Sequence, residues 1–312
     1  LTELTSISFG PPMNPVSPND GWAVGVATTS LLPSAPASGS HEPTIIHWNG
    51  FMWTKGVAIG TTNHLYSVYM VSSGDVWAVG GGPSTTASCT TPPCPVILHF
   101  AGGSWNTVTP PPGSYVLNSV FMVSANEGWA VGCQGTIAQC VTRTDPAGQG
   151  IILHYTVTGG VGSWAIFPAP TVGSPPAAIP PLNSVFMVNP NEGWAVGNAI
   201  LPISSPTAGD PIVLHYTVTG GVGNWNVVTI GGLVGSGAAA NLNSVFMLSP
   251  TSGWAVGGYT LDGVDGEPRG PIIVYWDGSK WTTVATPTIP GINPAVPPAL
   301  RSVYFTGPND GW

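Results

Sequence analysis

The chain has 312 residues, and its 5 Lys and Arg against 13 Asp and Glu leave a net charge of -8. Surfaces that bind nucleic-acid phosphates or anionic membranes need clustered cations, so this composition argues against both as partners. No apolar run reaches the roughly 18 residues of a membrane span, so no transmembrane segment is expected. Frequent Gly (43) and Pro (34), with short Val, Ile, Trp and Thr runs between them, predict an all-β protein.

A tryptophan-centred segment recurs along the chain. "LNSVFMVSANEGWAVG" at 117–132 returns as "LNSVFMVNPNEGWAVG" at 182–197, and six copies align on Trp at positions 22, 77, 129, 194, 254 and 312. The spacings of 55, 52, 65, 60 and 58 residues fit one propeller blade each. The repeats cover about 4–64, 65–116, 117–181, 182–241 and 242–299, with a partial copy at 300–312.

Each complete repeat predicts four strands in chain order. The first is an L-x-S-V/I run such as 242–247, and the second is W-A-V-G, such as 254–257. The third is an aliphatic run ending in aromatics: "IIHW", "VILHF", "IILHY", "IVLHY" and "IIVYW". The fourth begins at a second tryptophan: Trp53, Trp105, Trp164, Trp225 and Trp281. Short antiparallel strands repeated in this way predict a β-propeller, six-bladed, as a single domain over 1–312. The sixth repeat stops at Trp312 within its second strand, so we expect a longer native polypeptide.

The pattern "GWAVG … IILHY … G-x-W" resembles the photosystem II assembly-factor propellers and the wider Asp-box, or bacterial neuraminidase repeat, group. "WDGSKW" at 276–281 is the nearest match to an Asp-box turn, whereas "AGGSW", "TVTGGVGSW" and "TVTGGVGNW" lack the aspartate. The resemblance extends over essentially the whole chain. It implies the propeller fold and an assembly-factor-like binding role.

Polar residues that recur in every repeat are expected to be structural, because a catalytic residue is needed only once. One serine position (Ser6, Ser67, Ser119, Ser184, Ser244, Ser302) is therefore not a nucleophile. The acids before the tryptophan are expected in tight turns: Asp20, Asp75, Glu127, Glu192 and Asp310. The third-strand histidines His47, His99, His154 and His215, replaced by Tyr275 in the fifth repeat, stand about 10 Å from the innermost strand and diverge. They cannot share a metal ion, and we expect interblade hydrogen bonds instead.

Unrepeated charges fall in long loops, at 26–44, 80–95, 133–150, 198–211 and 258–271, which a propeller would place on one face. Binding residues commonly lie on such loops. The candidate ligand-binding residues are Glu42, Arg143, Asp145, Asp210 and Arg269. The loop "LDGVDGEPRG" brings together Asp262, Asp265 and Glu267, which could chelate calcium, although the spacing is not that of an EF-hand and a solvated acidic loop is the simpler interpretation. No other cofactor is expected.

The four cysteines form two close pairs, Cys89 with Cys94 and Cys133 with Cys140. Neither pair has a histidine at zinc-ligand spacing, so two disulfides are predicted. Disulfides require an oxidising compartment, which predicts an extracellular or cell-surface location.

These features predict a non-enzymatic surface, adhesion or structural module whose partners are other protein subunits or cell-surface glycans, in a homo-oligomer or filament. One alternative is a discrete glycan- or protein-binding receptor that uses the long-loop face. A second is a carbohydrate-active enzyme in which two of Glu42, Asp145 and Asp210 face each other across about 5 to 10 Å. Nothing in the sequence indicates such convergence.

Overall fold

The computed structural model describes residues 2–9, 19–28, 41–56, 63–86, 88–141, 148–173, 176–200, 209–230, 233, 238–261, 270–286 and 298–312. For 2, 27, 28, 41, 42, 238, 260 and 261 it describes the backbone only. These residues belong to two compact units, 1–167 and 168–312, and each unit is described by itself. The expectation of one propeller domain over 1–312 stays a prediction.

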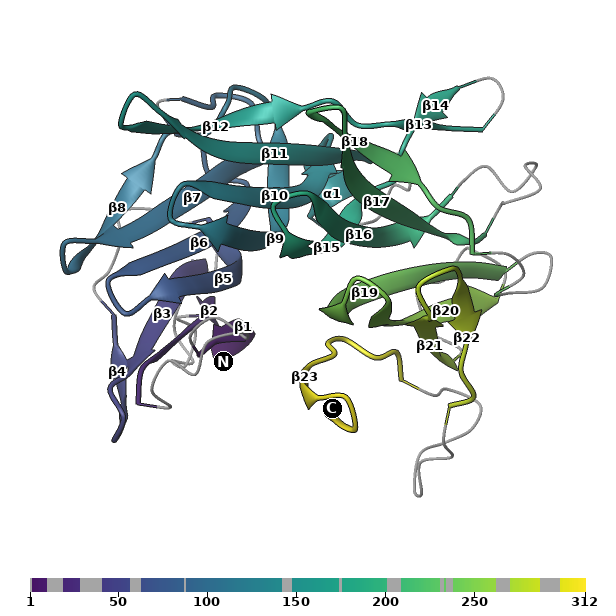
Figure 1. Cartoon of the computed structure of the whole chain (residues 1–312). Coiled ribbons are helices and arrows are strands. Elements are labelled where there is room, and N and C mark those ends of the chain that lie inside the picture. The colour runs from purple at the N-terminus through teal and green to yellow at the C-terminus, as the bar shows by residue number, and fades with distance from the viewer. Residues whose placement is uncertain are drawn as a thin grey trace, which may run out of the picture. The chain divides into compact units, whose positions relative to one another are not determined.

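The first unit contains three four-stranded antiparallel sheets, each built from strands consecutive in the chain (Figure 1). Blade 1 consists of β1 (Thr2–Ser8), β2 (Gly21–Thr28), β3 (His41–Trp48) and β4 (Trp53–Lys55). Blade 2 consists of β5 (His64–Ser72), β6 (Asp75–Gly82), β7 (Cys94–Ala101) and β8 (Ser104–Val108). Blade 3 consists of β9 (Tyr115–Ser124), β10 (Glu127–Gln134), β11 (Gln149–Thr158) and β12 (Val161–Phe167), with helix α1 (Ile137–Cys140) after β10.

The second unit contains two more sheets of the same kind. Blade 4 consists of β15 (Leu182–Asn189), β16 (Glu192–Ala199), β17 (Pro211–Thr219) and β18 (Val222–Val227). Blade 5 consists of β19 (Ala238–Ser249), β20 (Ser252–Leu261), β21 (Gly270–Trp276) and β22 (Trp281–Thr283). Two hairpins flank them, β13 (Thr171–Val172) with β14 (Ala177–Ala178), and β23 (Phe305–Gly307) with β24 (Asp310–Gly311). The predicted all-β propeller of four-stranded blades is confirmed, with five blades among the described residues and β23–β24 in the sixth repeat.

Aromatic rings pack neighbouring blades together, as the sequence predicts. Trp22 of blade 1 contacts Phe100 and Trp105 of blade 2 at centroid distances of 4.8 and 5.2 Å. The same contacts recur between Trp77 of blade 2 and Tyr155 and Trp164 of blade 3, and between Trp194 of blade 4 and Trp276 and Trp281 of blade 5. The first tryptophans of these sets, Trp22, Trp77 and Trp194, are at most 4% exposed. Burial of these large rings contributes apolar contact between blades 1 and 2, blades 2 and 3, and blades 4 and 5.

The L-x-S segments of the first, second, fourth and fifth repeats each form hydrogen bonds to the next repeat. Ser6 Oγ accepts from Val68 N at 3.2 Å, and the preceding Thr5 donates to Leu65 O at 2.8 Å. Ser67 accepts from Val120 N in the same way. In the second unit, Asn183 and Ser184 bond to blade 5, and Asn243 and Ser244 bond to the sixth repeat. The recurrence of this serine therefore has a structural cause, as expected.

The last glycine of each G-W-A-V-G segment is required by close approach of the backbone. A Cβ built at Gly80 would overlap the carbonyl oxygen of His64, and the corresponding overlap occurs at Gly25, Gly132, Gly197 and Gly257. In each blade the first strand changes register beside this glycine, as between Leu65 and Ser67. Such a bulge brings main-chain atoms over the neighbouring strand, where only glycine leaves room.

The hairpins between third and fourth strands use two kinds of turn. Blades 2, 3 and 4 have two glycines with positive φ, as in Gly102 (61°) and Gly103 (80°). In blade 5, the Asp277 carboxylate accepts from Ser279 N, Ser279 Oγ and Lys280 N, and Asn49 caps the blade 1 turn through Phe51 N and Met52 N. A glycine pair supplies the left-handed conformations of a type I′ turn without a side-chain cap, so the aspartate is dispensable there.

Candidate functional site

An acid, a histidine and a tryptophan form a compact stack in four blades. In blade 2, His99 Nε2 lies 2.8 Å from Asp75 Oδ1, and the imidazole stacks on Trp77 at 3.9 Å between centroids. The acid begins the second strand, and the antiparallel register places the histidine opposite the tryptophan. The other three stacks are Asp20–His47–Trp22 (2.6 Å), Glu127–His154–Trp129 (3.3 Å) and Glu192–His215–Trp194 (3.3 Å).

Blade 5 changes both polar members of the stack together. Ser252 replaces the acid, Tyr275 replaces the histidine, and their hydroxyls lie 3.3 Å apart. A pair of hydroxyl groups has taken the place of an acid–histidine pair while keeping the hydrogen bond. The expected turn position of the acids is confirmed, but the expectation of interblade histidine hydrogen bonds is wrong: each histidine bonds within its own blade.

Burial sets the titration of the two glutamate-paired histidines. The pKa of His154 and that of His215 are lowered below the ordinary 6.5, chiefly because desolvation disfavours imidazolium, and their hydrogen bonds to Glu127 and Glu192 offset this only in part. All four histidines keep 20 to 33% of their side-chain surface exposed. The same stack recurs in four blades, in each case with the imidazole packed on the tryptophan of its own blade.

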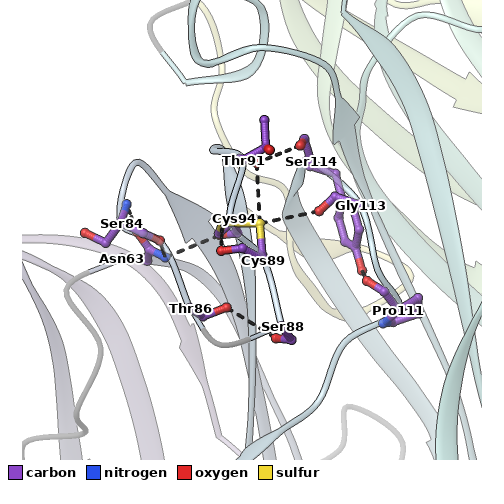
Figure 2. The surroundings of a disulfide bond; sticks show 11 residues. Asn63, Ser84, Thr86, Ser88, Cys89, Thr91, Cys94, Pro111, Gly113 and Ser114 are labelled. Carbon is purple, nitrogen blue, oxygen red and sulfur yellow. Dashed lines mark hydrogen bonds between the residues drawn. A yellow bond between two sulfur atoms is a disulfide. The ribbon is translucent and has the colours of Figure 1, made fainter.

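Two disulfides fix loops that follow second strands, as predicted. Cys89 and Cys94 have Cα atoms 5.6 Å apart, and Cys133 and Cys140 have Cα atoms 5.5 Å apart. Figure 2 shows the first disulfide beside Asn63, whose fully buried side chain donates to Ser84 O and accepts from Ser84 N, both at 2.8 Å. From the next strand connection, Ser114 Oγ donates to Thr91 O at 2.6 Å. The loop between β6 and β7 is therefore held by the disulfide, by the hydrogen bonds of Asn63 to Ser84, and by the hydrogen bond of Ser114 to Thr91.

Most of the predicted ligand-binding residues lie outside the described residues. These are Arg143, Asp145, Arg269 and the three acids of the calcium hypothesis, Asp262, Asp265 and Glu267. Glu42 lies in β3 with only its backbone described, and Asp210 is half-buried just before β17, where its carbonyl accepts from Ile200 N. Glu42 and Asp210 belong to different units, so the carboxylate pair of the enzyme hypothesis stays untested.

A groove of about 760 Å³ opens between blades 1 and 2. Its walls come from connections between first and second strands, with Asn19, Asp20 and Ser73, and from the ends of third-to-fourth-strand turns, with Asn49, Gly103 and Ser104. Its apolar lining is made by Trp22, Phe100 and Trp105. The volume is within the range of ligand-binding clefts, so this groove is the candidate site.

Sequence reasoning placed binding on the long-loop face and missed this groove. The long second-to-third-strand loops leave the opposite ends of the strands, because the groove is lined by first-to-second and third-to-fourth turns. Its sequence signal was that Asn49, in the turn after β3, and Lys55, in β4, correspond to Ala101 and Thr107 in blade 2.

In the part of the chain that the structure describes, no three His, Cys, Asp or Glu side chains gather as a metal site. Nor does any helix among those residues have the length and apolarity to cross a membrane.

No protein-family model and no curated protein matches the chain. Among solved structures it is similar to an ulvan lyase of polysaccharide lyase family PL25 bound to -[GlcA(1-4)Rha3S]-, with a TM-score of 0.46, 9% identity, and coverage of 85% of this chain and 67% of the lyase. It is also similar to the Pyrococcus horikoshii acylaminoacyl peptidase, with a TM-score of 0.46, 9% identity, and coverage of 91% of this chain and 39% of the peptidase. The N-terminal domain of Nup159 is similar with a TM-score of 0.27, 9% identity, and coverage of 83% of this chain and 71% of that domain. At TM-scores below 0.5, these similarities say nothing of activity.

Proposed function

We infer that the protein is a non-enzymatic, extracellular surface or adhesion module built on a disulfide-stapled propeller scaffold. The observation that carries this proposal is that the recurring polar side chains form contacts within the propeller itself. The serines bond to neighbouring blades, and the acid–histidine pairs stack on buried tryptophans. These polar groups hold the blades together, which leaves polar contacts with a ligand to residues that do not recur.

The two disulfides support the extracellular part of the proposal. Loop-closing disulfides persist in oxidising compartments and are rare in a reducing cytosol. The low content of charge, 6% of residues, leaves surfaces suited to packing against neutral partners, including other copies of the chain or glycans.

Kinship with the Asp-box or assembly-factor propellers is part of the proposal. The blade 5 turn supports it, because the Asp277 carboxylate organises that hairpin through three hydrogen bonds. The glycine-pair turns of blades 2, 3 and 4 are then variants of the same hairpin.

Immunogold labelling of intact producing cells, combined with acid-quenched maleimide trapping, tests the location. We expect label on the outer surface and four cysteines that resist alkylation until a reductant is added. Internal label with freely alkylated thiols would contradict the proposal.

The enzyme alternative is tested by alanine substitution of Glu42, Asp145 and Asp210. A glycosidase would lose turnover on its polysaccharide, whereas the proposed module has no turnover to lose. Hydrolysis by the wild type that these substitutions abolish would favour the enzyme.

A further inference from the structure

We propose that the groove between blades 1 and 2 binds a neutral saccharide unit of a glycan. This inference rests on the proposed adhesion function and names the class of ligand. The evidence is the aromatic lining of the groove, the polar groups at its rim, and the replacement of Asn49 and Lys55 at the matching positions of blade 2.

The aromatic lining is held in place before any ligand arrives. Trp22 is 4% exposed, stacks on His47 at 4.2 Å, and meets Trp105 edge to face at an interplanar angle of 86°. Phe100 lies 5.5 Å from Trp105, and both rings remain half-buried where they line the groove. A sugar ring has an apolar C–H face that packs on such rings, and fixed rings lose little entropy on binding.

Polar groups at the rim are available for a ligand. Asn49 uses Oδ1 to cap its turn, and within the described residues its Nδ2 has no partner. The Lys55 ammonium likewise has no ion-pair partner there, and the Ser73 and Ser104 hydroxyls are exposed. Amides and hydroxyls that converge on an apolar cleft match the mixture of donors and acceptors on a sugar.

The charge of the groove favours a neutral sugar over an anionic one. Asp20 is paired with His47 at 2.6 Å, which leaves Lys55 as the one cation without an ion-pair partner among the described lining residues. A phosphate or polyuronate site needs several cations or an Arg fork, whereas here a carboxylate lies in the same groove.

Two rim residues differ from their counterparts at the next junction, whereas aromatic and acid–histidine groups occur at both junctions. The junction between blades 2 and 3 repeats the acid–histidine–tryptophan stack and the aromatic pair, as Asp75, His99, Trp77, Tyr155 and Trp164. Ala101 and Thr107 occupy the positions of Asn49 and Lys55, whereas the asparagine at Asn19 recurs as Asn126 and Asn191. Folding alone does not require Asn49 and Lys55, because blade 2 forms the same four-stranded sheet with alanine and threonine at those positions.

The test is isothermal titration calorimetry of the full chain with cellohexaose, mannohexaose and chitohexaose, and with hexagalacturonate as the anionic probe. We expect at least one neutral hexasaccharide to bind. Trp105→Phe and the double variant Asn49→Asp with Lys55→Thr should each weaken that binding about tenfold, a loss typical of one good contact. Asn49→Asp keeps the turn cap, as Asp277 does in blade 5. Thr107→Ala, at the position of Lys55 in blade 2, is the matched control and should bind as the wild type does.

Three results would overturn the proposal: binding of none of the neutral probes, binding of hexagalacturonate alone, or neutral binding that both groove variants leave unchanged. Equal thermal midpoints of wild type and the Asn49→Asp, Lys55→Thr variant separate lost contacts from lost folding. Surface location and disulfide state are measured on cells, so failure of saccharide binding is distinguishable from failure of the proposed function.

Discussion

Substituting Gly80 by alanine is the most direct perturbation of the blade framework. The new Cβ would overlap the His64 carbonyl oxygen, far inside the 3.0 Å that real Cβ atoms respect. Strand β5 must therefore shift by roughly 1 Å, in an interior packed too densely to absorb it. Overpacking of this kind costs about 3 kcal/mol. For a chain of this size, that corresponds to a fall in thermal midpoint of about 6 °C.

Gly74→Ala is the matched control in the same blade. Nothing lies within 4 Å of a Cβ at Gly74, which is exposed in the β5–β6 turn and has no left-handed φ. Its substitution should change stability by less than about 0.5 kcal/mol. Both variants are compared by thermal unfolding followed by tryptophan fluorescence. Equal midpoints for Gly80→Ala and the wild type, or a larger loss for Gly74→Ala, would refute the close-approach argument.

The remaining predictions concern hydrogen bonds, titration and disulfides. Ser67→Ala leaves the buried Val120 N–H without its partner and should cost about 1 to 3 kcal/mol in urea unfolding, whereas exposed Ser73→Ala should cost almost nothing. Because the folded-state pKa of His154 and of His215 lies below 6.5, the unfolded chain binds protons first, so their contribution to stability is complete above about pH 6.5 and is lost as pH falls through the lowered values. His154→Phe should flatten that part of the stability–pH curve, and an unchanged curve would contradict the assignment. The Asp277 carboxyl, held by Ser279 and Lys280, should titrate by NMR with a pKa of about 2. Cys89→Ser with Cys94→Ser should cost about 2 kcal/mol through a six-residue loop, and a loss near zero would show that the hydrogen bonds of Asn63 and Ser114 hold the loop without the disulfide.

Most of the features that could be predicted from the sequence were predicted from residues that recur in each repeat or lie close together in the chain. Period, strand order and the disulfide pairs follow from local patterns, because blade strands are consecutive in the chain and both cysteine pairs are close in sequence. The acid–histidine pairs were missed because Asp75 and His99 lie 24 residues apart and meet only through strand register. The joint change to Ser252 and Tyr275 in the fifth repeat was the available signal.

The groove was harder to predict for a different reason. It is formed by side chains of two blades whose facing turns are separated by the whole length of a repeat. Loop length, the cue that sequence offers, indicated the opposite face. The difference of Asn49 and Lys55 from their blade 2 counterparts becomes informative only when the contact between the blades is known.

The central claim, a non-enzymatic surface module, is tested most directly by the intact mass and assembly state of the untagged protein purified from the cells that produce it. Light scattering and negative-stain electron microscopy of that material would measure both. The account predicts surface-derived, disulfide-bonded protein in regular assemblies or bound to cell-wall glycan. A monomer released from the cytosol with reduced cysteines and with hydrolytic activity on a polysaccharide would contradict it.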